Sequence, residues 1–267
     1  MCELLAIASR HPTAVSMSLD QFAGHGSADS DNKDGWGIVY YEEGDIRRFR
    51  DVGPAGASTW VDFVEEQEIH STLFMAHIRQ ANVGTIGLPN THPFARELGG
   101  SMHTFAHNGF LKDFTDSGLF RTSRFNCLGE TDSEWAFCGL LEGLADLWLE
   151  GDDIPPIADR LAVISDFAAK IRSLGIANFI YGDGDALFVH ADRRIQEDGV
   201  VREPGLWLHR QTASDNIEAV SGGGGGVEID SPPQQIVMAA SVPLAEDGWE
   251  PLPGGALLAL RNGDVYS

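Results

Sequence analysis

Short apolar runs separated by turn sequences are the feature that most limits how this chain can fold. The runs 4–8, 36–41 and 72–77 have the length of strands. The run 36–41 is expected to pair with 46–50 across the turn Glu43-Gly44-Asp45. Further strands are expected at 102–106, in a hairpin over 177–190 that turns at Asp183-Gly184, at 235–241, at 255–260, and at Val265-Tyr266 after the turn Asn262-Gly263-Asp264. The chain is therefore predicted to be rich in antiparallel sheet.

Two longer segments show helical periodicity instead. Residues 132–149 carry apolar side chains on one face, and Thr131 with Glu134 forms the pattern of a capping box. Residues 157–174 repeat the pattern, with Pro155-Pro156 before the segment and Gly175 after it as the expected helix stop. Many strands, two helices and no regular βαβ alternation predict an α+β layered fold.

The composition favours one domain and excludes some partners. The chain has 267 residues, 43% of them hydrophobic, and no linker long enough to divide it, so residues 2–267 are expected to form a single domain. The net charge is −22, which argues against binding to nucleic acid or to an anionic membrane surface. The run Gly222–Gly226 reads as a flexible loop, because no Lys-Ser/Thr follows it as in a phosphate-binding loop.

The three cysteines indicate a reducing compartment. Cys2, Cys127 and Cys138 form no CxxC pair, and their spacing with the histidines matches no zinc pattern. The sequence shows no charged-then-apolar leader and no apolar run near the about 18 residues of a membrane span. We therefore expect a soluble cytoplasmic protein without a metal ion.

Cys2 directly follows the initiator Met1, which a cell is expected to remove before so small a residue. The chain would then begin with a thiol and an α-amine on one residue, a nucleophile with its own base. Taken alone, an early cysteine is more often a buried structural residue.

Five short motifs follow Cys2 and change that balance. They are DGWG at 34–37, AHIRQAN at 76–82, NTHPF at 90–94, AHNG at 106–109 and GETDSE at 129–134. Behind a second-position cysteine and in this order, they make the chain resemble the class II glutamine amidotransferases, the N-terminal-nucleophile kind, and more narrowly the stand-alone bacterial YafJ type. The resemblance covers nearly the whole chain. It implies a four-layer αββα sandwich, in which two antiparallel sheets pack face to face with helices outside.

The resemblance also implies roles for individual residues. Cys2 would attack the γ-carboxamide of glutamine, and its α-amine would pass the thiol proton to the departing ammonia. Asn108 and the backbone N–H of Gly109 would stabilise the oxyanion. Arg79 would hold the α-carboxylate of glutamine by a two-pronged contact, and Asp132 would pair with its α-ammonium.

Other motif residues have less definite roles. Trp36 would bind substrate as a wall of the pocket, or else be a core tryptophan. His77 and His107 are expected to be hydrogen-bonding scaffold, since the mechanism needs no histidine. His92 is left without a role.

The sequence contains no motif of a second domain that would use the ammonia. After residue 190 the sequence contains no nucleotide-binding or phosphosugar motif, and no cofactor is expected. One hypothesis is a glutamine-hydrolysing enzyme that delivers ammonia to a separate synthetase. Another is a stand-alone hydrolase that cleaves the γ-glutamyl amide of a small metabolite or peptide. A third is a non-catalytic subunit that binds γ-glutamyl compounds.

Overall fold

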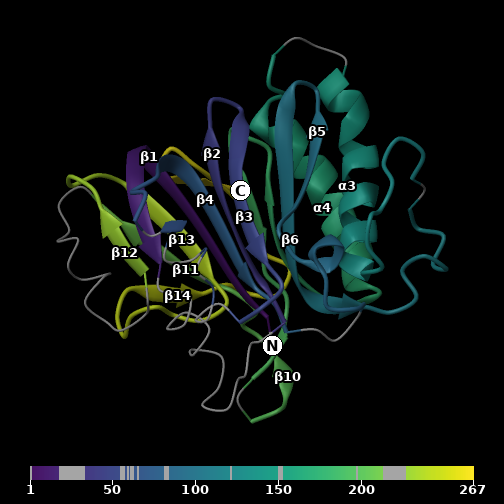
Figure 1. The fold of residues 1–267 in the computed structure, drawn as a ribbon. Coiled ribbons are helices and arrows are strands. Elements are labelled where there is room, and N and C mark those ends of the chain that lie inside the picture. The colour runs from purple at the N-terminus through teal and green to yellow at the C-terminus, as the bar shows by residue number, and fades with distance from the viewer. Residues whose placement is uncertain are drawn as a thin grey trace.

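Strand β1 (Glu3–Met17) lies inside the larger of two antiparallel sheets in the computed structural model of the chain (Figure 1). It pairs with β4 (His70–Ile78) on one side and with β13 (Ile236–Ala240) on the other. The sheet has the order β14-β11-β13-β1-β4-β2-β3, and β12 also pairs with β1. Its remaining strands are β2 (Trp36–Glu42), β3 (Asp45–Asp51), β11 (Trp207–Gln211), β12 (Val227–Asp230) and β14 (Trp249–Pro251).

The second sheet has the order β16-β15-β8-β7-β6-β5. Its strands are β5 (Phe94–Leu98), β6 (Ser101–Leu111), β7 (Gly175–Gly182), β8 (Leu187–His190), β15 (Leu257–Arg261) and β16 (Asp264–Tyr266). A separate two-stranded hairpin is formed by β9 (Arg194–Ile195) and β10 (Val201–Arg202). A 3-10 turn, η2 (Leu88–Asn90), connects the two sheets along the chain, between β4 and β5.

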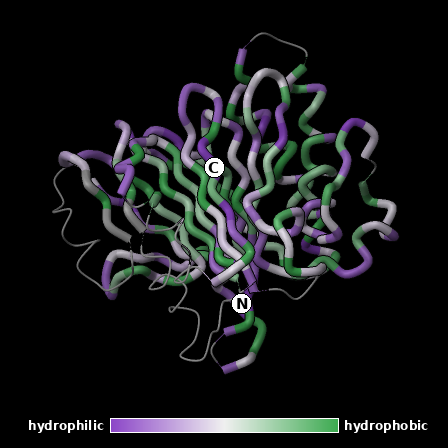
Figure 2. The backbone as a smooth tube through the Cα atoms, viewed as in Figure 1, coloured by the Kyte–Doolittle hydropathy of each residue, from purple (hydrophilic) through white to green (hydrophobic). Residues whose placement is uncertain are grey.

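The apolar alternation of β1 explains how the sheets pack. Leu4, Ala6 and Ala8 point into the core shared with Ile180 and Val189 of the second sheet. The intervening side chains of β1 contribute to a separate apolar cluster of the first sheet, because successive residues of a strand face opposite ways. Both faces of β1 are therefore buried over residues 3–9, and hydrophobic colour dominates the central strands of the sheets (Figure 2).

Helices α3 (Asp132–Leu149) and α4 (Ile157–Arg172) cover the other face of the second sheet (Figure 1). Their apolar faces pack on Phe105 and Phe179 of that sheet. Among the described residues, the helices, the second sheet and the first sheet form three successive layers, which confirms the α+β prediction. The fourth layer that the resemblance implies stays a prediction. None of the helices in the described part of the chain is long and apolar enough to cross a membrane.

The structure describes residues 2–17, 34–54, 58, 60, 63–64, 66–80, 84–120, 122–149, 153–196, 198–212 and 227–267. All the strands expected from the sequence are present, and their turns lie at the expected residues, with Gly44, Gly184 and Gly263 at positive φ. The expected glycine loop 222–226 lies outside the described residues.

Three local predictions need correction. Strand β1 runs on to Met17, well beyond the expected apolar run. Helix α4 ends at Arg172, and Gly175 is not a helix stop but the first residue of β7, where a Cβ would lie 1.9 Å from the carbonyl oxygen of Phe110. The capping box is only half formed: the N–H of Glu134 donates to Thr131 Oγ1 over 3.2 Å, but the Glu134 carboxylate binds elsewhere.

Candidate active site

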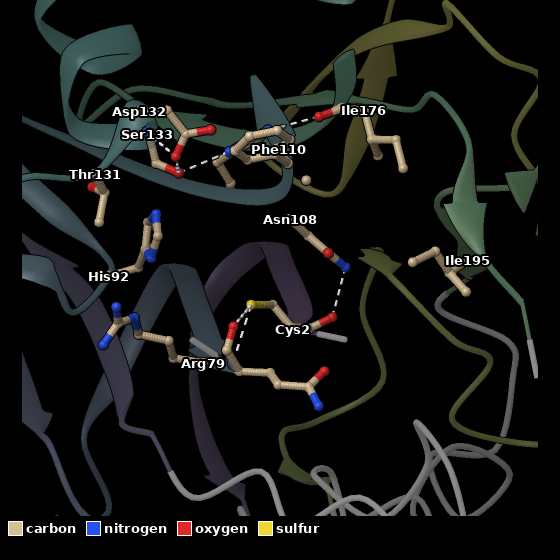
Figure 3. Close-up of a pocket in the computed structure, with 13 residues that line it drawn as sticks. Cys2, Arg79, His92, Asn108, Phe110, Thr131, Asp132, Ser133, Ile176 and Ile195 are labelled. Carbon is tan, nitrogen blue, oxygen red and sulfur yellow. Dashed lines mark hydrogen bonds between the residues drawn. The ribbon is translucent and has the colours of Figure 1, made fainter. Parts of the chain in front are cut away.

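Cys2 lies at the start of β1 and faces a pocket built from several separate segments (Figure 3). Because Glu3 pairs with Ile78, the residues that follow Ile78 lie beside Cys2. The pocket is lined by Cys2, Arg79, Gln80, His92, His107, Asn108, Gly109, Phe110, Thr131, Asp132, Ser133, Ile176 and Ile195. The fold thus brings five of the six predicted site residues to one cavity.

The thiol of Cys2 contacts the backbone of Gln80. The Gln80 N–H donates to Sγ over 3.2 Å, and Sγ lies 3.4 Å from the Gln80 carbonyl oxygen. Burial raises the pKa of the Cys2 thiol, while the Gln80 N–H and the charge of Arg79 oppose that rise. A group that takes the thiol proton during attack is therefore needed.

Asn108 and Gly109 come from the end of β6, directly beside Cys2. The Asn108 side chain is buried, and its Nδ2 donates to the Cys2 carbonyl oxygen over 2.6 Å. Asn178 Nδ2 in turn donates to the Asn108 carbonyl oxygen over 3.2 Å. At Gly109 a Cβ would lie 1.9 Å from the carbonyl oxygen of Ile176, so only glycine lets β6 and β7 approach this closely.

Arg79 lies in the pocket wall and is almost fully buried, with 3% of its surface exposed. Its guanidinium nitrogens are 3.4 Å from the carbonyl oxygens of Asp34 and Thr85, and its backbone N–H donates to the Gly35 carbonyl oxygen over 2.8 Å. Burial lowers the pKa of the guanidinium, and Cys2 and Asp34 act in the opposite direction. A carboxylate bound in the pocket would offset the free-energy cost of burying the Arg79 guanidinium.

Asp132 is the first residue of α3 and lines the opposite part of the pocket from Arg79 (Figure 3). Its Oδ2 accepts the Leu111 N–H over 2.6 Å, and its Oδ1 accepts the Ser133 N–H over 2.9 Å. The cap of the helix is supplied by Thr131, as expected. Oδ1 also lies 3.5 Å from Ser133 Oγ, whereas Oδ2 has the Leu111 N–H as its one donor among the described residues, so Oδ2 can still accept from a bound ammonium group.

The loop before α3 is held by the carboxylate of Glu134. This carboxylate accepts the N–H groups of Leu128 and Gly129 over 3.0 and 2.7 Å and pairs with Arg96 over 2.5 Å. Only 1% of the Glu134 side chain is exposed, so these three contacts compensate a buried charge. They fix the segment that leads into Thr131 and Asp132.

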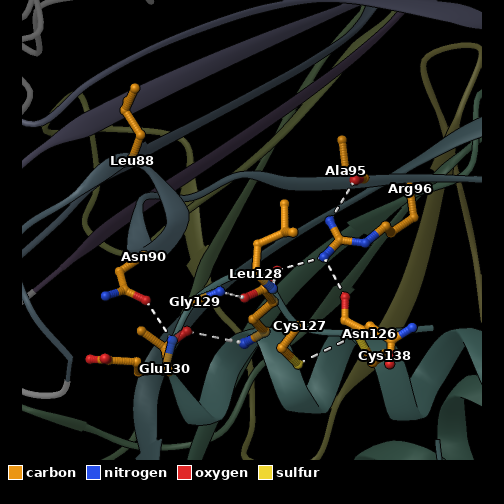
Figure 4. A network of polar contacts seen from close by, with 12 residues as sticks. Leu88, Asn90, Ala95, Arg96, Asn126, Cys127, Leu128, Gly129, Glu130 and Cys138 are labelled. Carbon is orange, nitrogen blue, oxygen red and sulfur yellow. Dashed lines mark hydrogen bonds and ion pairs between the residues drawn. The ribbon is translucent and has the colours of Figure 1, made fainter.

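Asn90 connects this loop to the Arg79 side of the pocket (Figure 4). Its Oδ1 accepts the Glu130 N–H over 2.8 Å, and its Nδ2 donates to the Thr85 carbonyl oxygen over 2.9 Å. That same carbonyl oxygen lies against the guanidinium of Arg79. The two ends of the pocket are therefore positioned by one network.

The remaining cysteines contribute no disulfide. Cys127 and Cys138 are free, with their sulfur atoms 3.7 Å apart beside this loop.

Three histidines lie in or under the pocket. His107 is a hydrogen-bonding scaffold, as expected: Nδ1 lies 2.8 Å from Ser133 Oγ and Nε2 lies 3.1 Å from the Ile176 carbonyl oxygen. His77 is buried and packs its ring 4.3 Å from that of His92, and neither of its ring nitrogens has a partner at hydrogen-bonding distance among the described residues. Burial lowers the pKa of His77 to about 3, so its ring is neutral.

His92 is the histidine to which the sequence assigned no role. It lines the pocket, and its ring packs at a tilt between those of His77 and Phe94. Trp36 is fully buried in the apolar cluster of the first sheet and is not among the residues that line the pocket. Of the two possibilities left open for Trp36, its position favours a core residue.

Several pocket residues are not visible as such in the sequence. Gln80 and Ser133 sit inside recognised motifs, whereas Phe110, Ile176 and Ile195 are ordinary apolar residues whose convergence depends on the folded sheets. A buried ion pair also supports the site. Arg194 Nη2 lies 3.0 Å from Glu3 Oε1, and no local sequence signal joins residues 191 positions apart.

Comparison with known proteins places this geometry in a family. A sequence model described as class-II glutamine amidotransferases matches residues 1–267. The chain is 38% identical over 188 residues to the Escherichia coli K12 protein YafJ, named as a candidate glutamine amidotransferase, covering 69% of this chain and 70% of that protein. It is 31% identical over 270 residues to the uncharacterized protein MJ1515 of Methanocaldococcus jannaschii, covering 100% of this chain and 71% of that protein.

Solved structures show the same relationship. A predicted glutamine amidotransferase from Pseudomonas aeruginosa superposes with a TM-score of 0.67 at 28% identity, covering 100% of both chains. The glutamine phosphoribosylpyrophosphate amidotransferase of Bacillus subtilis superposes with a TM-score of 0.59 at 15% identity, covering 99% of this chain and 48% of that one, which shows a shared fold. This chain belongs to the class II glutamine amidotransferases, enzymes that act on amide C–N bonds.

Proposed function

We propose that this enzyme hydrolyses the γ-amide of glutamine through a thioester on Cys2 and releases ammonia and glutamate. The observation that carries the proposal is that Cys2, Arg79, Asn108 and Asp132, from four separate segments, line one pocket. Their chemistry matches the three parts of the substrate: a nucleophile for the amide carbon, a cation for the α-carboxylate and an anion for the α-ammonium. The pocket also holds an amide donor next to the nucleophile.

The proposed reaction begins with removal of Met1, which gives Cys2 a free α-amine. This amine takes the thiol proton as Sγ attacks the amide carbon, and it passes that proton to the departing ammonia. The Gln80 N–H, which already donates to Sγ, favours the thiolate. Water then cleaves the γ-glutamyl thioester to glutamate and restores the thiol.

The oxyanion is assigned to Asn108 and Gly109. Asn108 Nδ2 carries two protons, of which one is donated to the Cys2 carbonyl oxygen. The second proton, whose contact with Ser241 Oγ is long at 3.4 Å, and the Gly109 N–H are the proposed oxyanion donors. Arg79 binds the α-carboxylate in a two-pronged contact, and Asp132 binds the α-ammonium near the positive end of the α3 dipole.

The same proposal covers the wider setting of the enzyme. Residues 2–267 act as one domain with the four-layer αββα arrangement of N-terminal-nucleophile hydrolases, in the cytoplasm and without a cofactor. The ammonia is used by a separate synthetase. We keep Trp36 as a core residue behind the pocket in this proposal.

The test is a mass measurement combined with one variant. Intact mass is measured before and after treatment with a diazoketone analogue of glutamine that alkylates such thiols. We expect loss of the Met1 mass and one adduct that maps to Cys2, and we expect Cys2→Ala to take up no adduct and release no ammonia. Ammonia release by Cys2→Ala at the wild-type rate would overturn the mechanism.

A further inference from the structure

Two cross-strand pairs of apolar residues lie at one side of the pocket, and Phe110, Ile176 and Ile195 of these pairs line it. Phe110 pairs with Ile176 across β6 and β7, and Ile195 pairs with Val201 across β9 and β10. Directly opposed residues of an antiparallel pair point to the same face. Because Ile195 lines the pocket, Val201 extends this apolar wall outward from it.

This wall reaches past the nucleophile. In Figure 3, Ile195 lies on the opposite side of Cys2 from Arg79, and Ile176 lies on the same side as Ile195. If Arg79 holds the amino-acid end and the amide carbon meets Sγ, the amide nitrogen is directed toward Ile195. Glutamine carries only hydrogen atoms on that nitrogen, so it leaves the apolar side chains beyond it uncovered.

The β9–β10 hairpin is anchored rather than loosely attached. At its base the buried pair of Arg194 with Glu3 joins it to the residue next to Cys2. Within the hairpin, the Gln196 N–H donates to the Val200 carbonyl oxygen over 3.0 Å, and Arg202 pairs with Asp198 over 2.7 Å. The position of Ile195 relative to the thiol is therefore set by the fold.

The apolar side chains of this hairpin are nevertheless uncovered. Ile195 is 43% exposed and Val201 is 46% exposed, and the hairpin projects below the sheets with hydrophobic residues on it (Figures 1 and 2). Adjacent exposed β-branched residues on an ordered hairpin that is continuous with a catalytic pocket indicate a binding surface.

We propose, resting on the proposed function, that Ile195 and Val201 bind an apolar group carried by the departing nitrogen. Besides glutamine, this enzyme then accepts as substrates the γ-glutamyl amides of small apolar amines. Sγ of Cys2 forms a bond to the amide carbon, the C–N bond breaks, and the amine leaves with the thiol proton. Water cleaves the thioester, so the products are glutamate and the free amine.

The experiment compares glutamine with the γ-glutamyl amides of methylamine, ethylamine and n-butylamine. Glutamate, the product common to all four, is measured with the purified chain that has lost Met1. Each methylene that the wall covers is expected to raise kcat/KM by about two- to fourfold, because burial of one methylene contributes about 0.8 kcal/mol. The butylamide is expected to be the best substrate.

Two exposed valines provide a matched pair of variants. Val201→Asn is expected to lower the ratio of kcat/KM for the butylamide to that for glutamine by about five- to tenfold. Val200→Asn changes the neighbouring valine, which is 53% exposed and outside the Ile195–Val201 pair, and is expected to leave that ratio unchanged.

The outcomes separate this inference from the proposed function. Hydrolysis of glutamine with no gain along the amide series, or an equal effect of both valine variants, would overturn the subsite and leave the glutaminase reaction intact. The hairpin would then be better explained as a contact for a protein. Release of glutamate from none of the four compounds would overturn the proposed function and the subsite together.

Discussion

Asn108 holds Cys2 by its backbone: Nδ2 of Asn108 donates to the main-chain oxygen of Cys2 over 2.6 Å. The side chain proposed to stabilise the oxyanion therefore also fixes the residue that carries the nucleophile. Asn108 is itself held by Asn178 from β7. Nucleophile and oxyanion donor are thus tied to both sheets at once.

Asn108→Ala is expected to lower kcat for glutamine by about 100- to 1,000-fold, because loss of one oxyanion donor typically costs about 2.7–4 kcal/mol of barrier. Steady-state ammonia release measures the effect, and a thermal melt separates it from unfolding. Asn126→Ala, on the exposed loop before α3, is the control and should keep the wild-type kcat. A kcat within threefold of wild type for Asn108→Ala would remove Asn108 from the oxyanion site.

Arg79→Lys keeps the positive charge but loses the planar fork that grips a carboxylate. We expect KM for glutamine to rise by about 10- to 100-fold with a smaller change in kcat. The control is Arg47→Lys, since Arg47 forms an exposed pair with Glu42 on the β2–β3 hairpin. An unchanged KM would show that Arg79 does not bind the α-carboxylate.

Buried neutral histidines should make the enzyme less stable in acid. Burial lowers the pKa of His190 from 6.5 to about 4, so between these pH values the unfolded chain takes up a proton that the folded chain does not. The stabilisation is complete above pH about 6.5 and is lost as the pH falls toward 4, with a slope of about 1.4 kcal/mol per pH unit for each such histidine.

His190→Phe removes this proton and should make the dependence of the free energy of unfolding on pH shallower by about that slope. Urea titrations at several pH values between 4.5 and 7 measure it. Val189→Ala on the same strand is the control: it should lower the stability at every pH without altering the slope. Identical slopes for His190→Phe and wild type would contradict the assignment.

Glycine is required at position 37, in the DGWG motif, because the His92–Pro93 backbone lies close to it and not because the chain turns there. A Cβ there would lie 2.1 Å from the His92 carbonyl oxygen and 2.8 Å from Cδ of Pro93. Gly37→Ala is expected to lower the free energy of unfolding by about 3 kcal/mol. Gly53→Ala is the control, because no atom lies within 4 Å of the added Cβ; it should change the free energy of unfolding by less than about 0.5 kcal/mol. Equal losses of stability in the two variants would refute the packing argument.

Sequence patterns predicted the hairpins and helices that depend on residues close together in the chain. The strands of the β2–β3 and β7–β8 hairpins follow from their apolar runs and turn residues, and α3 follows from its stripe and its Thr131 cap. Cys2, Arg79, Asn108, Gly109 and Asp132 line one pocket, whereas Trp36 lies in the apolar core of the first sheet.

The features that sequence reasoning missed depend on distant partners. Polar residues interrupt the apolar run of β1 after Ala8, yet the strand continues because Gln234 accepts the His11 N–H over 2.7 Å. The Glu134 carboxylate leaves the capping box because Arg96 lies nearby in space. Strands β9 and β10 have two residues each, too few for a periodic signal.

The pairing of β1 with β13 sets the order in which this enzyme can become active during its synthesis. Cys2 is synthesised long before β13 and before Ser241, whose hydroxyl oxygen accepts the Leu4 N–H over 3.0 Å and lies 3.4 Å from Asn108 Nδ2. Arg194, the partner of Glu3, also emerges late. A nascent chain therefore carries Cys2 without the strands that hold it, and amide cleavage by the proposed mechanism can begin only after β13 has been made.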